Sequence, residues 1–425
     1  MMADLSRALL GNKVRDPAAE STLHKPPGVA QTEGHPLTAK TGAIVIGGDY
    51  RGLGIVRSLG RRGIPVWVLV DDHQLAARSR FARRSFSWPD SGDDEHVRFL
   101  LKLCAEHRLD GWALFPTGDE TAALISRRHT ELAQHFTLTT APWNEFRWAY
   151  DKNLSNELAD QLGIDHPRTW CPTSRAELET IDVVFPAILK PAYKSTMNQF
   201  TRAKAWQVSN REELLAKYDE ACTYTTPDAI LVQEIIPGGG DTQLSFGALA
   251  VDGCVVASIT ARRTRQYPMD FGRASTFVET IVDDEVDAAA RRLIGATHLT
   301  GLVEVEFKRD PRTSRLQLLD INPRVWGWHT LGQPAGIDFS YLMWRVAFQL
   351  PVTVAHGRPG VRWVRGMTDF PMVTKEILGR KMSLGDYLRS VRPPFESAIF
   401  ALDDPLPAAI EVPLALGLIM RRRAV

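Results

Sequence analysis

The sequence predicts a protein of several domains, in which an α/β domain is followed by an α+β region. Over residues 42–140, short apolar runs alternate with helical stretches, a pattern typical of a parallel sheet with crossover helices. From about residue 186 onward, apolar runs of strand length dominate, and turn signals at 252–253 and 310–314 indicate antiparallel hairpins. A chain of 425 residues is long enough for about two to four domains.

The first domain opens with an apolar strand at 43–46, a glycine-rich turn at 47–54 and a helix. Further strands are expected at 66–70 and 112–115, with a helix at 97–107 between them. Asp71 lies 24 residues beyond Gly47, so a Rossmann-type NAD site is a competing interpretation. The glycine spacing differs from G-x-G-x-x-G, and the glycines need only allow a tight turn. The N-terminus of the following helix would also suit an anionic group of a substrate.

The middle of the chain is predicted to combine helices with an antiparallel sheet. One helical segment begins at Asp151-Lys152, and another follows residues 172–174. Asp252-Gly253 joins two apolar runs and is a strong signal for a tight hairpin. The strands of this region are expected at 187–190, 204–208, 230–235, 245–251, 255–263, 301–308 and 316–321.

The composition excludes several classes of protein. The chain has 51 Lys+Arg and 50 Asp+Glu, a balance that argues against a nucleic-acid binder with a broad basic surface. Its 11 Trp, 17 Phe and 8 Tyr supply enough apolar area to exclude disorder throughout. The four cysteines contain no C-x-x-C pair, which argues against a zinc ribbon or a redox pair and fits a reducing compartment. We therefore expect a cytoplasmic globular protein.

The two ends of the chain are expected to differ from its core. Residues 1–40 lack both a sustained periodicity and the apolar segment of a secretory signal, and are predicted to be a disordered leader. No window holds about 18 uninterrupted apolar residues, so no membrane-spanning helix is expected. Residues 405–420 run into three arginines at 421–423, which leaves open a peripheral membrane contact. We favour a helix packed on the body with a solvated basic end.

The residues that indicate chemistry lie in the last predicted hairpin. Residues two apart in a strand share a face, so Asp320 and Asn322 project together, and an antiparallel partner can bring Glu306 opposite them. Two carboxylates and an amide oxygen are hard donors of the kind that Mg²⁺ prefers. Arg324 follows and could hold a phosphoryl group through two N–H groups. The alternative is a strand pair with ordinary surface charges, but the flanking apolar residues favour a buried hairpin.

Taken together, these motifs resemble the ATP-grasp superfamily of carboxylate–amine ligases, over about residues 42–350 and in the expected order. The resemblance implies an ATP-grasp fold preceded by a Rossmann-like preATP-grasp domain. It divides the chain into a leader at 1–40, a preATP-grasp domain at 41–140, ATP-grasp N-terminal and C-terminal subdomains at 141–228 and 229–350, and an accessory segment at 351–425.

The same resemblance implies a set of ligand-binding residues. Asp151-Lys152, the strand at 185–191 and the hinge at 232–238 match segments that contact ATP in the superfamily. Glu306, Asp320 and Asn322 correspond to the ligands of Mg²⁺, expected as two ions and replaceable by Mn²⁺, and Arg324 to a catalytic arginine. The implied ATP contacts are Lys152, Lys190, Lys204, Glu234, Ile236 and Asp241.

The sequence departs from the superfamily pattern in two places. Asp320 replaces the more usual glutamate, which shortens the ligand by one methylene and keeps its charge. Residues 192–202 lack the glycines of a flexible lid. A further run at 262–273 resembles an uncharacterised subgroup described as predicted carboligases, and its position implies contact with the reacting carboxylate. Arg263 and Arg265 are expected to point the same way and to bind that carboxylate.

The resemblance implies an ATP- and Mg²⁺-dependent ligase that activates a carboxylate as an acyl phosphate and joins it to an amine. Its partners would be small-molecule acids and amines, which the motifs do not identify. A bicarbonate-activating carboxylase and a catalytically silent ATP-binding regulator are the alternatives. Trp326, Trp328 and His329 could wall the acceptor pocket, and residues 351–425 could complete the substrate site or mediate formation of a homodimer.

Overall fold

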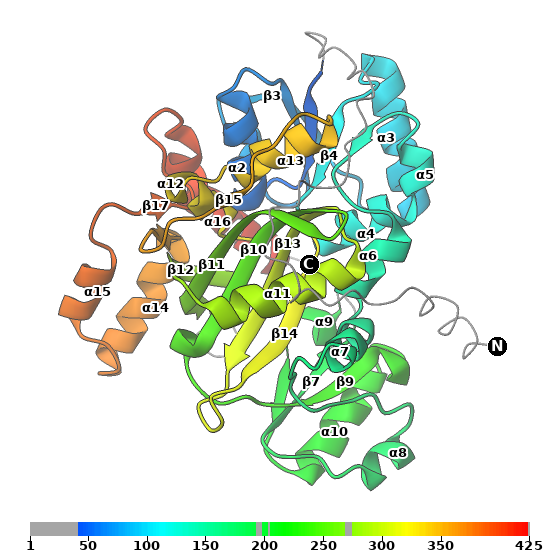
Figure 1. The fold of residues 1–425 in the computed structure, drawn as a ribbon, viewed down its shortest axis with the longest axis vertical. Coiled ribbons are helices and arrows are strands. Elements are labelled where there is room, and N and C mark those ends of the chain that lie inside the picture. The colour runs from blue at the N-terminus through cyan, green and yellow to red at the C-terminus, as the bar shows by residue number, and fades with distance from the viewer. Residues whose placement is uncertain (1–40, 193–197, 203–204, 268–273, 424–425) are drawn as a thin grey trace, which may run out of the picture. The chain divides into compact units, whose positions relative to one another are not determined.

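The structure is a computed structural model, and it describes residues 41–192, 198–202, 205–267 and 274–423. These residues belong to one compact unit, in which the described strands form three sheets (Figure 1). The predicted leader at 1–40 and the candidate ATP ligand Lys204 lie outside the described residues.

The first sheet is parallel, with strand order β3-β2-β1-β4-β5, which confirms the α/β prediction. On strand β1 (Ala43–Ile46), alternate residues belong to two apolar cores, one shared with α2 and one with α3. The strand is therefore buried on both faces, which explains its continuous apolar run. The other elements are α2 (Tyr50–Gly60), β2 (Val66–Val70), β3 (Ala82–Ser87), α3 (Asp93–His107), β4 (Ala113–Pro116), α4 (Asp119–Arg127), α5 (His129–Leu132) and β5 (Thr137–Leu138).

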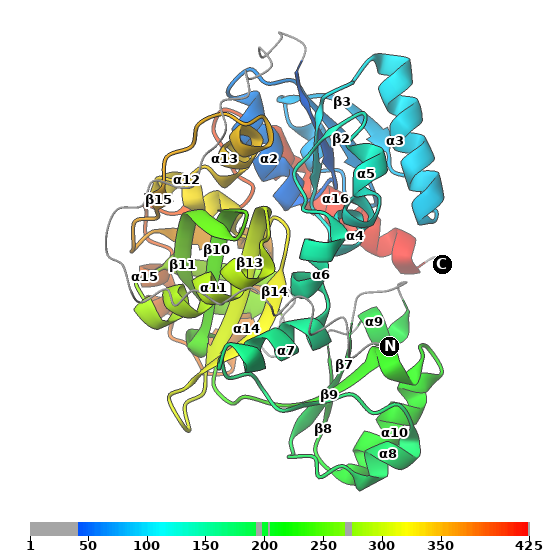
Figure 2. The same cartoon turned by 45° about the vertical axis from the view of Figure 1, so that its right-hand side comes forward.

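The second sheet is small and antiparallel, with strand order β6-β9-β7-β8. Two helices lead to it: α6 (Trp143–Tyr150) packs on α4, and α7 (Lys152–Gln161) packs against β14 of the third sheet (Figure 2). Leu214 and Tyr218 of α10 share one apolar core with Leu189 of β7. The elements are β6 (Thr169–Trp170), α8 (Arg175–Thr180), β7 (Ala187–Pro191), α9 (Gln199–Arg202), β8 (Trp206–Val208), α10 (Arg211–Cys222) and β9 (Ile230–Glu234).

The third sheet is the largest, with strand order β14-β13-β10-β11-β12-β16-β17, and β15 pairs with β11. The predicted hairpin at Asp252-Gly253 is confirmed: both residues have positive φ, 48° and 72°, as the tightest hairpin turns require. Helix α11 packs its apolar face on this sheet. The elements are β10 (Gln243–Val251), β11 (Cys254–Tyr267), β12 (Ala274–Thr280), α11 (Asp284–Thr297), β13 (Gly301–Arg309), β14 (Leu316–Asn322), α12 (Gly332–Ala335) and α13 (Phe339–Ala347).

The C-terminal segment, which begins at residue 351, contains helices and also adds strands to the third sheet. Its strand β16 pairs with β12, and β17 pairs with β16. Two buried ion pairs attach the segment to the rest of the chain: Arg57 of α2 contacts Asp404 at 2.9 Å, and Arg265 of β11 contacts Asp369 at 2.8 Å. The elements are β15 (Ala355–His356), β16 (Arg362–Val364), α14 (Gly366–Leu378), α15 (Leu384–Ser390), β17 (Glu396–Ser397) and α16 (Leu406–Arg423).

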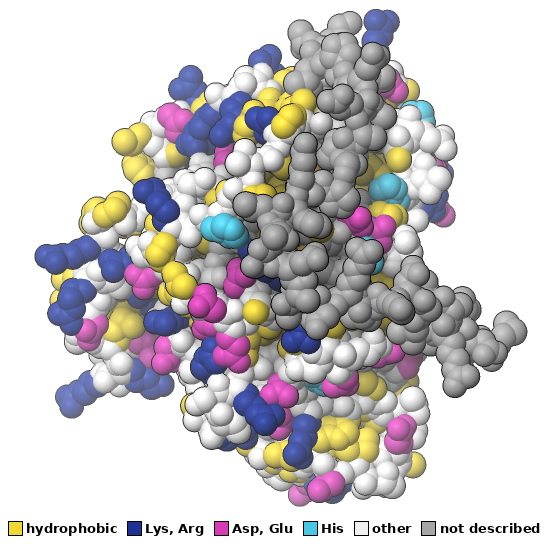
Figure 3. Space-filling view, in the orientation of Figure 1, with side chains coloured by type: hydrophobic (Ala, Val, Ile, Leu, Met, Phe, Trp, Pro, Cys, Tyr) yellow, Lys and Arg dark blue, Asp and Glu magenta, His cyan; other side chains and the backbone are white. Residues whose placement is uncertain are grey.

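Helices α14 and α15 expose apolar side chains. Phe370 and Leu378 of α14 and Leu384 and Leu388 of α15 are all exposed. Over these helices, hydrophobic side chains intermix with Lys and Arg side chains (Figure 3). Across the described ranges of the chain, no helix combines the length and the apolar character needed to span a membrane.

Candidate active site

The hairpin of β13 and β14 brings the three predicted metal ligands together. Glu306 lies directly opposite Asp320 in the strand register, as the alternation predicted, and Glu304 lies opposite Asn322. The amide Nδ2 of Asn322 donates to Oε1 of Glu306 at 2.9 Å. Two carboxylates and an amide therefore share one face of the hairpin.

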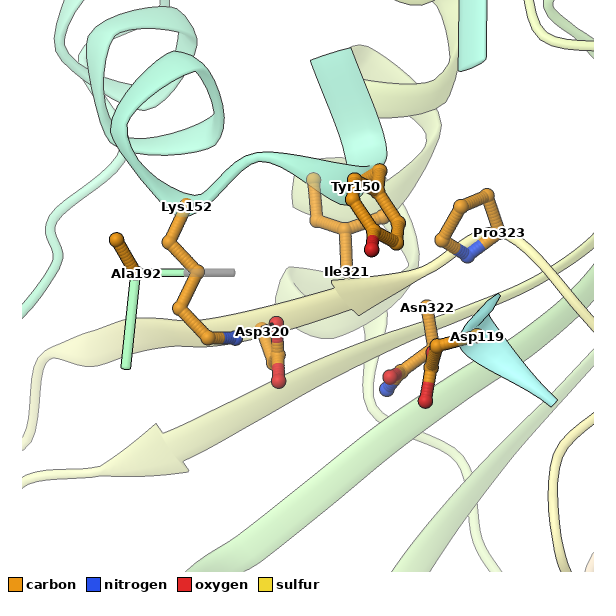
Figure 4. Close-up of a pocket in the computed structure, with 8 residues that line it drawn as sticks. All are labelled: Asp119, Tyr150, Lys152, Ala192, Asp320, Ile321, Asn322 and Pro323. Atoms are coloured by element: carbon orange, nitrogen blue, oxygen red, sulfur yellow. Dashed lines mark hydrogen bonds and ion pairs between the residues drawn. The ribbon is translucent and has the colours of Figure 1, made fainter. Parts of the chain in front are cut away.

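A small space beside this hairpin is lined by residues from four stretches of the chain (Figure 4). The Lys152 amine points at Asp320, and its Nζ donates to Oδ1 of that carboxylate at 2.5 Å. The space measures about 20 Å³, which exceeds the minimum of about 10–15 Å³ that one water needs. Its oxygen donors and its size fit a small hard cation with water. The lining residues are Asp119, Tyr150, Lys152, Ala192, Asp320, Ile321, Asn322 and Pro323.

Arg324 is held by a carboxylate of the first domain. Its Nε and Nη2 donate to the two oxygens of Asp119 at 2.7 and 3.1 Å, and Nη2 also donates to Oδ1 of Asn322 at 3.1 Å. Asp119 begins α4, directly beyond the carboxyl end of β4. Asp119 was not among the site residues predicted from the sequence. Its place at the carboxyl end of a parallel strand, where α/β sheets bind ligands, was the available signal.

Arg263 of β11 lies on the face of the third sheet that carries Glu306. Its Nε donates to Oγ of Ser275 at 2.7 Å, and its guanidinium forms an ion pair with Glu306. Burial disfavours the charge of Arg263, but Glu306 and Glu304 outweigh that effect and raise its pKa. Glu304 was not predicted as a site residue. Burial, together with the charge of Glu306, raises its pKa to about 7, and Nε1 of Trp328 donates to it at 2.9 Å.

Arg265 does not share the partner of Arg263, contrary to the expectation that both point the same way. Its Nε and Nη2 donate to the two oxygens of Asp369 at 2.8 Å each, and its Nη1 donates to Ser390 at 2.9 Å. The pairing of β11 with β12 is irregular between Arg262 and Arg265, which interrupts the alternation of the side chains. Because the partners of Arg265 belong to the C-terminal segment and not to the hairpin of β13 and β14, we leave Arg265 out of the proposed substrate site.

Most of the predicted ATP contacts lie on or next to the second sheet. Lys190 of β7 donates to Oε1 of Gln233 at 2.8 Å, and the neighbouring Glu234 of β9 accepts from the backbone N–H of Arg168 at 3.2 Å. Glu234 also lines a hollow of about 550 Å³, which is large enough for a nucleoside. Ile236 is buried, whereas Asp241 is exposed in the turn that precedes β10.

The glycine-rich turn serves close packing. A Cβ on Gly47, whose φ is 126°, would lie 1.9 Å from Oγ1 of Thr117. Asp49 caps α2 by accepting from the backbone N–H groups of Arg51 and Gly52 at 2.8 and 3.3 Å. A carboxylate of the chain itself therefore occupies the helix N-terminus, where the sequence had suggested an anionic substrate group.

The aromatic run after the hairpin is part of the core and does not form an open pocket wall. Trp326 and Trp328 are fully buried, and Nδ1 of His329 contacts the backbone oxygen of Trp326 at 3.0 Å. Burial lowers the pKa of His329 to about 4, so its ring is neutral near pH 7. The ring lies against α2, where a Cβ on Gly54 would come within 2.6 Å of it.

Comparison with known proteins gives distant matches. No family model matches the chain. It is 26% identical over 313 residues to the carbamoyl phosphate synthase large chain of Xylella fastidiosa, covering 68% of this chain and 27% of that protein. The same protein of a Thermotoga species is 26% identical over 247 residues, and the match covers 54% of this chain and 21% of that protein. The chain thus spans about a quarter of the length of these relatives.

Three solved structures share the architecture. The L-amino acid ligase of Bacillus licheniformis has a TM-score of 0.57 at 14% identity and covers 74% of this chain and 75% of its own. The biotin carboxylase domain of a Hydrogenobacter thermophilus 2-oxoglutarate carboxylase was solved with MgADP and bicarbonate. It has a TM-score of 0.60 at 14% identity, and the match covers 75% of this chain and 73% of that domain. N5-carboxyaminoimidazole ribonucleotide synthetase of Thermus thermophilus has a TM-score of 0.56 at 15% identity, and the match covers 75% of this chain and 81% of that protein. These likenesses show a common fold.

Proposed function

On the premise that this chain has the ATP-grasp fold, as its sequence motifs predicted, we propose that it is an ATP- and Mg²⁺-dependent carboxylate–amine ligase. The reaction would convert a carboxylate and an amine into an amide, with ATP converted to ADP and phosphate. The observation that carries the proposal is the convergence of Glu306, Asp320 and Asn322 with Arg263 and Arg324 on one face of the large sheet.

Glu306, Asp320 and Asn322 would hold the magnesium. When bound, the metal supplies positive charge that neutralises the phosphate oxygens. The chain adds fixed cations of its own: Lys152 contacts Asp320, and Arg263 contacts Glu306. With Asp320 engaged by magnesium, Lys152 would be free to balance the charge of a bound phosphate group, and with Glu306 engaged in the same way, Arg263 would be free to bind an anionic substrate group.

The chain's own residues would also position the organic substrate. A carboxylate resists attack because its charge repels nucleophiles, and transfer of a phosphoryl group to it creates a good leaving group. Arg263 is our candidate for the group that binds this carboxylate, since it is buried and lies beside the hairpin of Glu306. Arg324 would bind the phosphoryl group, and Asp119 orients it through two hydrogen bonds.

The nucleotide would lie along the second sheet. We assign phosphate contacts to Lys152, Lys190 and Lys204, adenine contacts to Glu234 and Ile236, and a ribose contact to Asp241. Glu234 lines the hollow of about 550 Å³, which supports the adenine contact of this residue. We also propose the domain boundaries expected from the sequence, a cytoplasmic location, and small-molecule acids and amines as partners. Sedimentation analysis would test for a homodimer.

Two measurements test the function. With Mg²⁺ and a panel of acids and amines, ADP release should depend on both substrates, and calorimetry should detect binding of MgATP. Asp320→Asn should weaken MgATP binding at least tenfold, whereas Asp386→Asn on the exposed helix α15 should not. Wild-type protein without MgATP binding or substrate-dependent ADP release would contradict the proposal.

One comparison favours a second candidate. The Hydrogenobacter thermophilus structure contains bicarbonate together with MgADP. A bicarbonate-activating carboxylase would release ADP in response to bicarbonate without an organic acid, so including bicarbonate alone in the panel separates the two functions.

A further inference from the structure

Three side chains that can bind a metal ion meet beside the first sheet, where α3 and α5 lie side by side (Figure 1, Figure 2). Cys104 lies in the last turn of α3, Asp110 in the turn between α3 and β4, and His135 in the turn between α5 and β5. One sulfur, one carboxylate oxygen and one ring nitrogen of these residues all lie within 4.8 Å of one another. The three atoms are therefore close enough to surround one ion.

Backbone hydrogen bonds hold these three positions together. The N–H of Gly111 donates to the carbonyl of His135 at 2.8 Å, which fixes the turn of Asp110 beside that histidine. The N–H of Leu109 donates to the carbonyl of Cys104 at 3.1 Å, which ties the same turn to the end of α3. Leu109 is itself buried and anchors the turn in the core. Because the chain already places the ligands, binding an ion would need little further ordering.

The spacing of the ligand atoms fits a tetrahedral zinc ion. Bonds of about 2.0–2.3 Å from zinc to nitrogen, oxygen and sulfur place two ligands of a tetrahedral site about 3.4–3.6 Å apart. Nδ1 of His135 lies 3.7 Å from Oδ1 of Asp110, which is close to this separation. The two side chains are 44% (His135) and 73% (Asp110) exposed, so they can turn toward an ion without disturbing the core.

The chemistry of the three groups favours zinc over magnesium. A thiolate and an imidazole are ligands that Zn²⁺ accepts readily, whereas Mg²⁺ prefers oxygen. The thiolate of Cys104 and the carboxylate of Asp110 would together balance the two positive charges of the ion. In the described structure the sulfur of Cys104 is not part of a disulfide. The cluster therefore differs in kind from the oxygen-rich hairpin of the candidate active site.

We propose that Cys104, Asp110 and His135 bind one Zn²⁺ ion, with water as the fourth ligand, and that the ion clamps α3 to the segments leading into β4 and β5. These two strands are parallel, and Asp110 and His135 come shortly before them, so the site lies at the edge of the sheet where the strands begin. Asp119 of the candidate active site lies beyond the other end of β4. The zinc would stabilise the first domain, and this inference does not depend on the proposed ligase function.

Zinc binding by the full chain without an affinity tag tests the assignment. Equilibrium dialysis with metal analysis should find about one Zn²⁺ per chain that excess Mg²⁺ does not displace. Asp110→Asn and His135→Gln should each weaken binding at least tenfold, and both positions are exposed enough for the variants to fold. His135→Cys, which supplies another zinc ligand, should restore most of the affinity. Zn²⁺ should raise the melting temperature of wild type but not that of the Asn and Gln variants.

Cobalt(II) in place of zinc reports whether the sulfur is a ligand. The wild-type complex should show a thiolate-to-cobalt charge-transfer band in the near ultraviolet, and Cys104→Ser should remove it. Asp320→Asn should keep the band, because the proposed magnesium ligands contain no sulfur. This comparison separates the cluster from cobalt bound at the candidate active site.

The chain also offers a matched control in the exposed pair of Asp252 and His298. Nδ1 of His298 lies 3.2 Å from Oδ1 of Asp252, and within the described part of the chain no third residue of the metal-binding types completes a cluster with them. His298→Gln should therefore keep the zinc affinity and the cobalt band of wild type.

Three results would overturn the zinc site. The first is wild-type protein that binds Zn²⁺ no more tightly than the Asp110→Asn and His135→Gln variants. The second is a cobalt complex without a sulfur band, or with a band that Cys104→Ser leaves unchanged. The third is a zinc complex that melts at the same temperature as the metal-free protein, which would contradict the clamping role.

Discussion

Asp119 and Arg324 form a bidentate ion pair that joins the first domain to the hairpin of β13 and β14, which carries the proposed metal ligands. The two hydrogen bonds measure 2.7 and 3.1 Å, and the side chains are only 10% (Arg324) and 16% (Asp119) exposed. Paired N–H groups fix the plane of a guanidinium as well as its position. The first domain therefore sets the orientation of an arginine that belongs to the proposed catalytic hairpin.

Replacing Asp119 by Asn should lower kcat at least tenfold while changing the KM for ATP by less than threefold. The variant keeps the shape of the side chain but removes the charge and one acceptor, so Arg324 loses its fixed orientation. Steady-state kinetics of ADP release would measure both parameters. Asp94→Asn is the control, because Asp94 pairs with Arg128 at an exposed position of the same domain. Wild-type kcat in the Asp119 variant would contradict the positioning role.

Replacing Asp369 by Ala should destabilise the protein by about 3–5 kcal/mol, because it leaves the buried charge of Arg265 without a partner. Denaturant unfolding followed by tryptophan fluorescence would measure the change. The double variant Arg265→Met with Asp369→Leu should recover much of the loss, since it removes both charges. A loss below 1 kcal/mol in the single variant would show that this ion pair does not hold the C-terminal segment.

Glu396 should make stability depend on pH. Burial raises its pKa to about 7, although Arg61 and Arg57 oppose the rise. The folded state therefore binds this proton more tightly than the unfolded state, in which the ordinary pKa is 4.5. The tighter proton binding of Glu396 in the folded state adds to the free energy of unfolding. This contribution is fully present below pH 4.5 and is lost as the pH rises to about 7.

Glu396→Gln should accordingly be more stable than wild type at pH 8, by about 1–3 kcal/mol, and nearly equal to it at pH 4.5. Denaturant unfolding at both pH values gives the comparison. Glu212→Gln at the exposed start of α10 serves as the control and should follow wild type. A Glu396 variant whose stability relative to wild type does not change with pH would contradict the assignment.

Replacing Gly54 by Ala should destabilise the protein by about 1–3 kcal/mol through overpacking. A Cβ there would lie 2.6 Å from Nε2 of the buried His329. Gly366→Ala is the control, because nothing lies within 4 Å of a Cβ at that position. Thermal unfolding compares the two variants, and equal melting temperatures would show that the His329 region can relax.

Local patterns in the sequence were sufficient for much of this fold. The alternation of apolar runs and helices predicted the parallel first sheet, and Asp252-Gly253 predicted the hairpin between β10 and β11. The period of two along a strand placed Glu306 opposite Asp320. Each of these features depends on neighbouring residues in one or two strands, so turn chemistry and side-chain alternation determine it.

The tertiary structure decided the contacts between distant segments. Asp119 and Arg324 are 205 residues apart, and Arg265 and Asp369 are 104 apart. No local period relates such positions, and the irregularity in β11 reversed the expectation for Arg265. The sequence by itself supplied the residues that we propose as ligands of metal and ATP. The packing of the first domain and the C-terminal segment against the large sheet decided how its arginines are oriented, because a charge removed from water takes whichever partner the packing brings within reach.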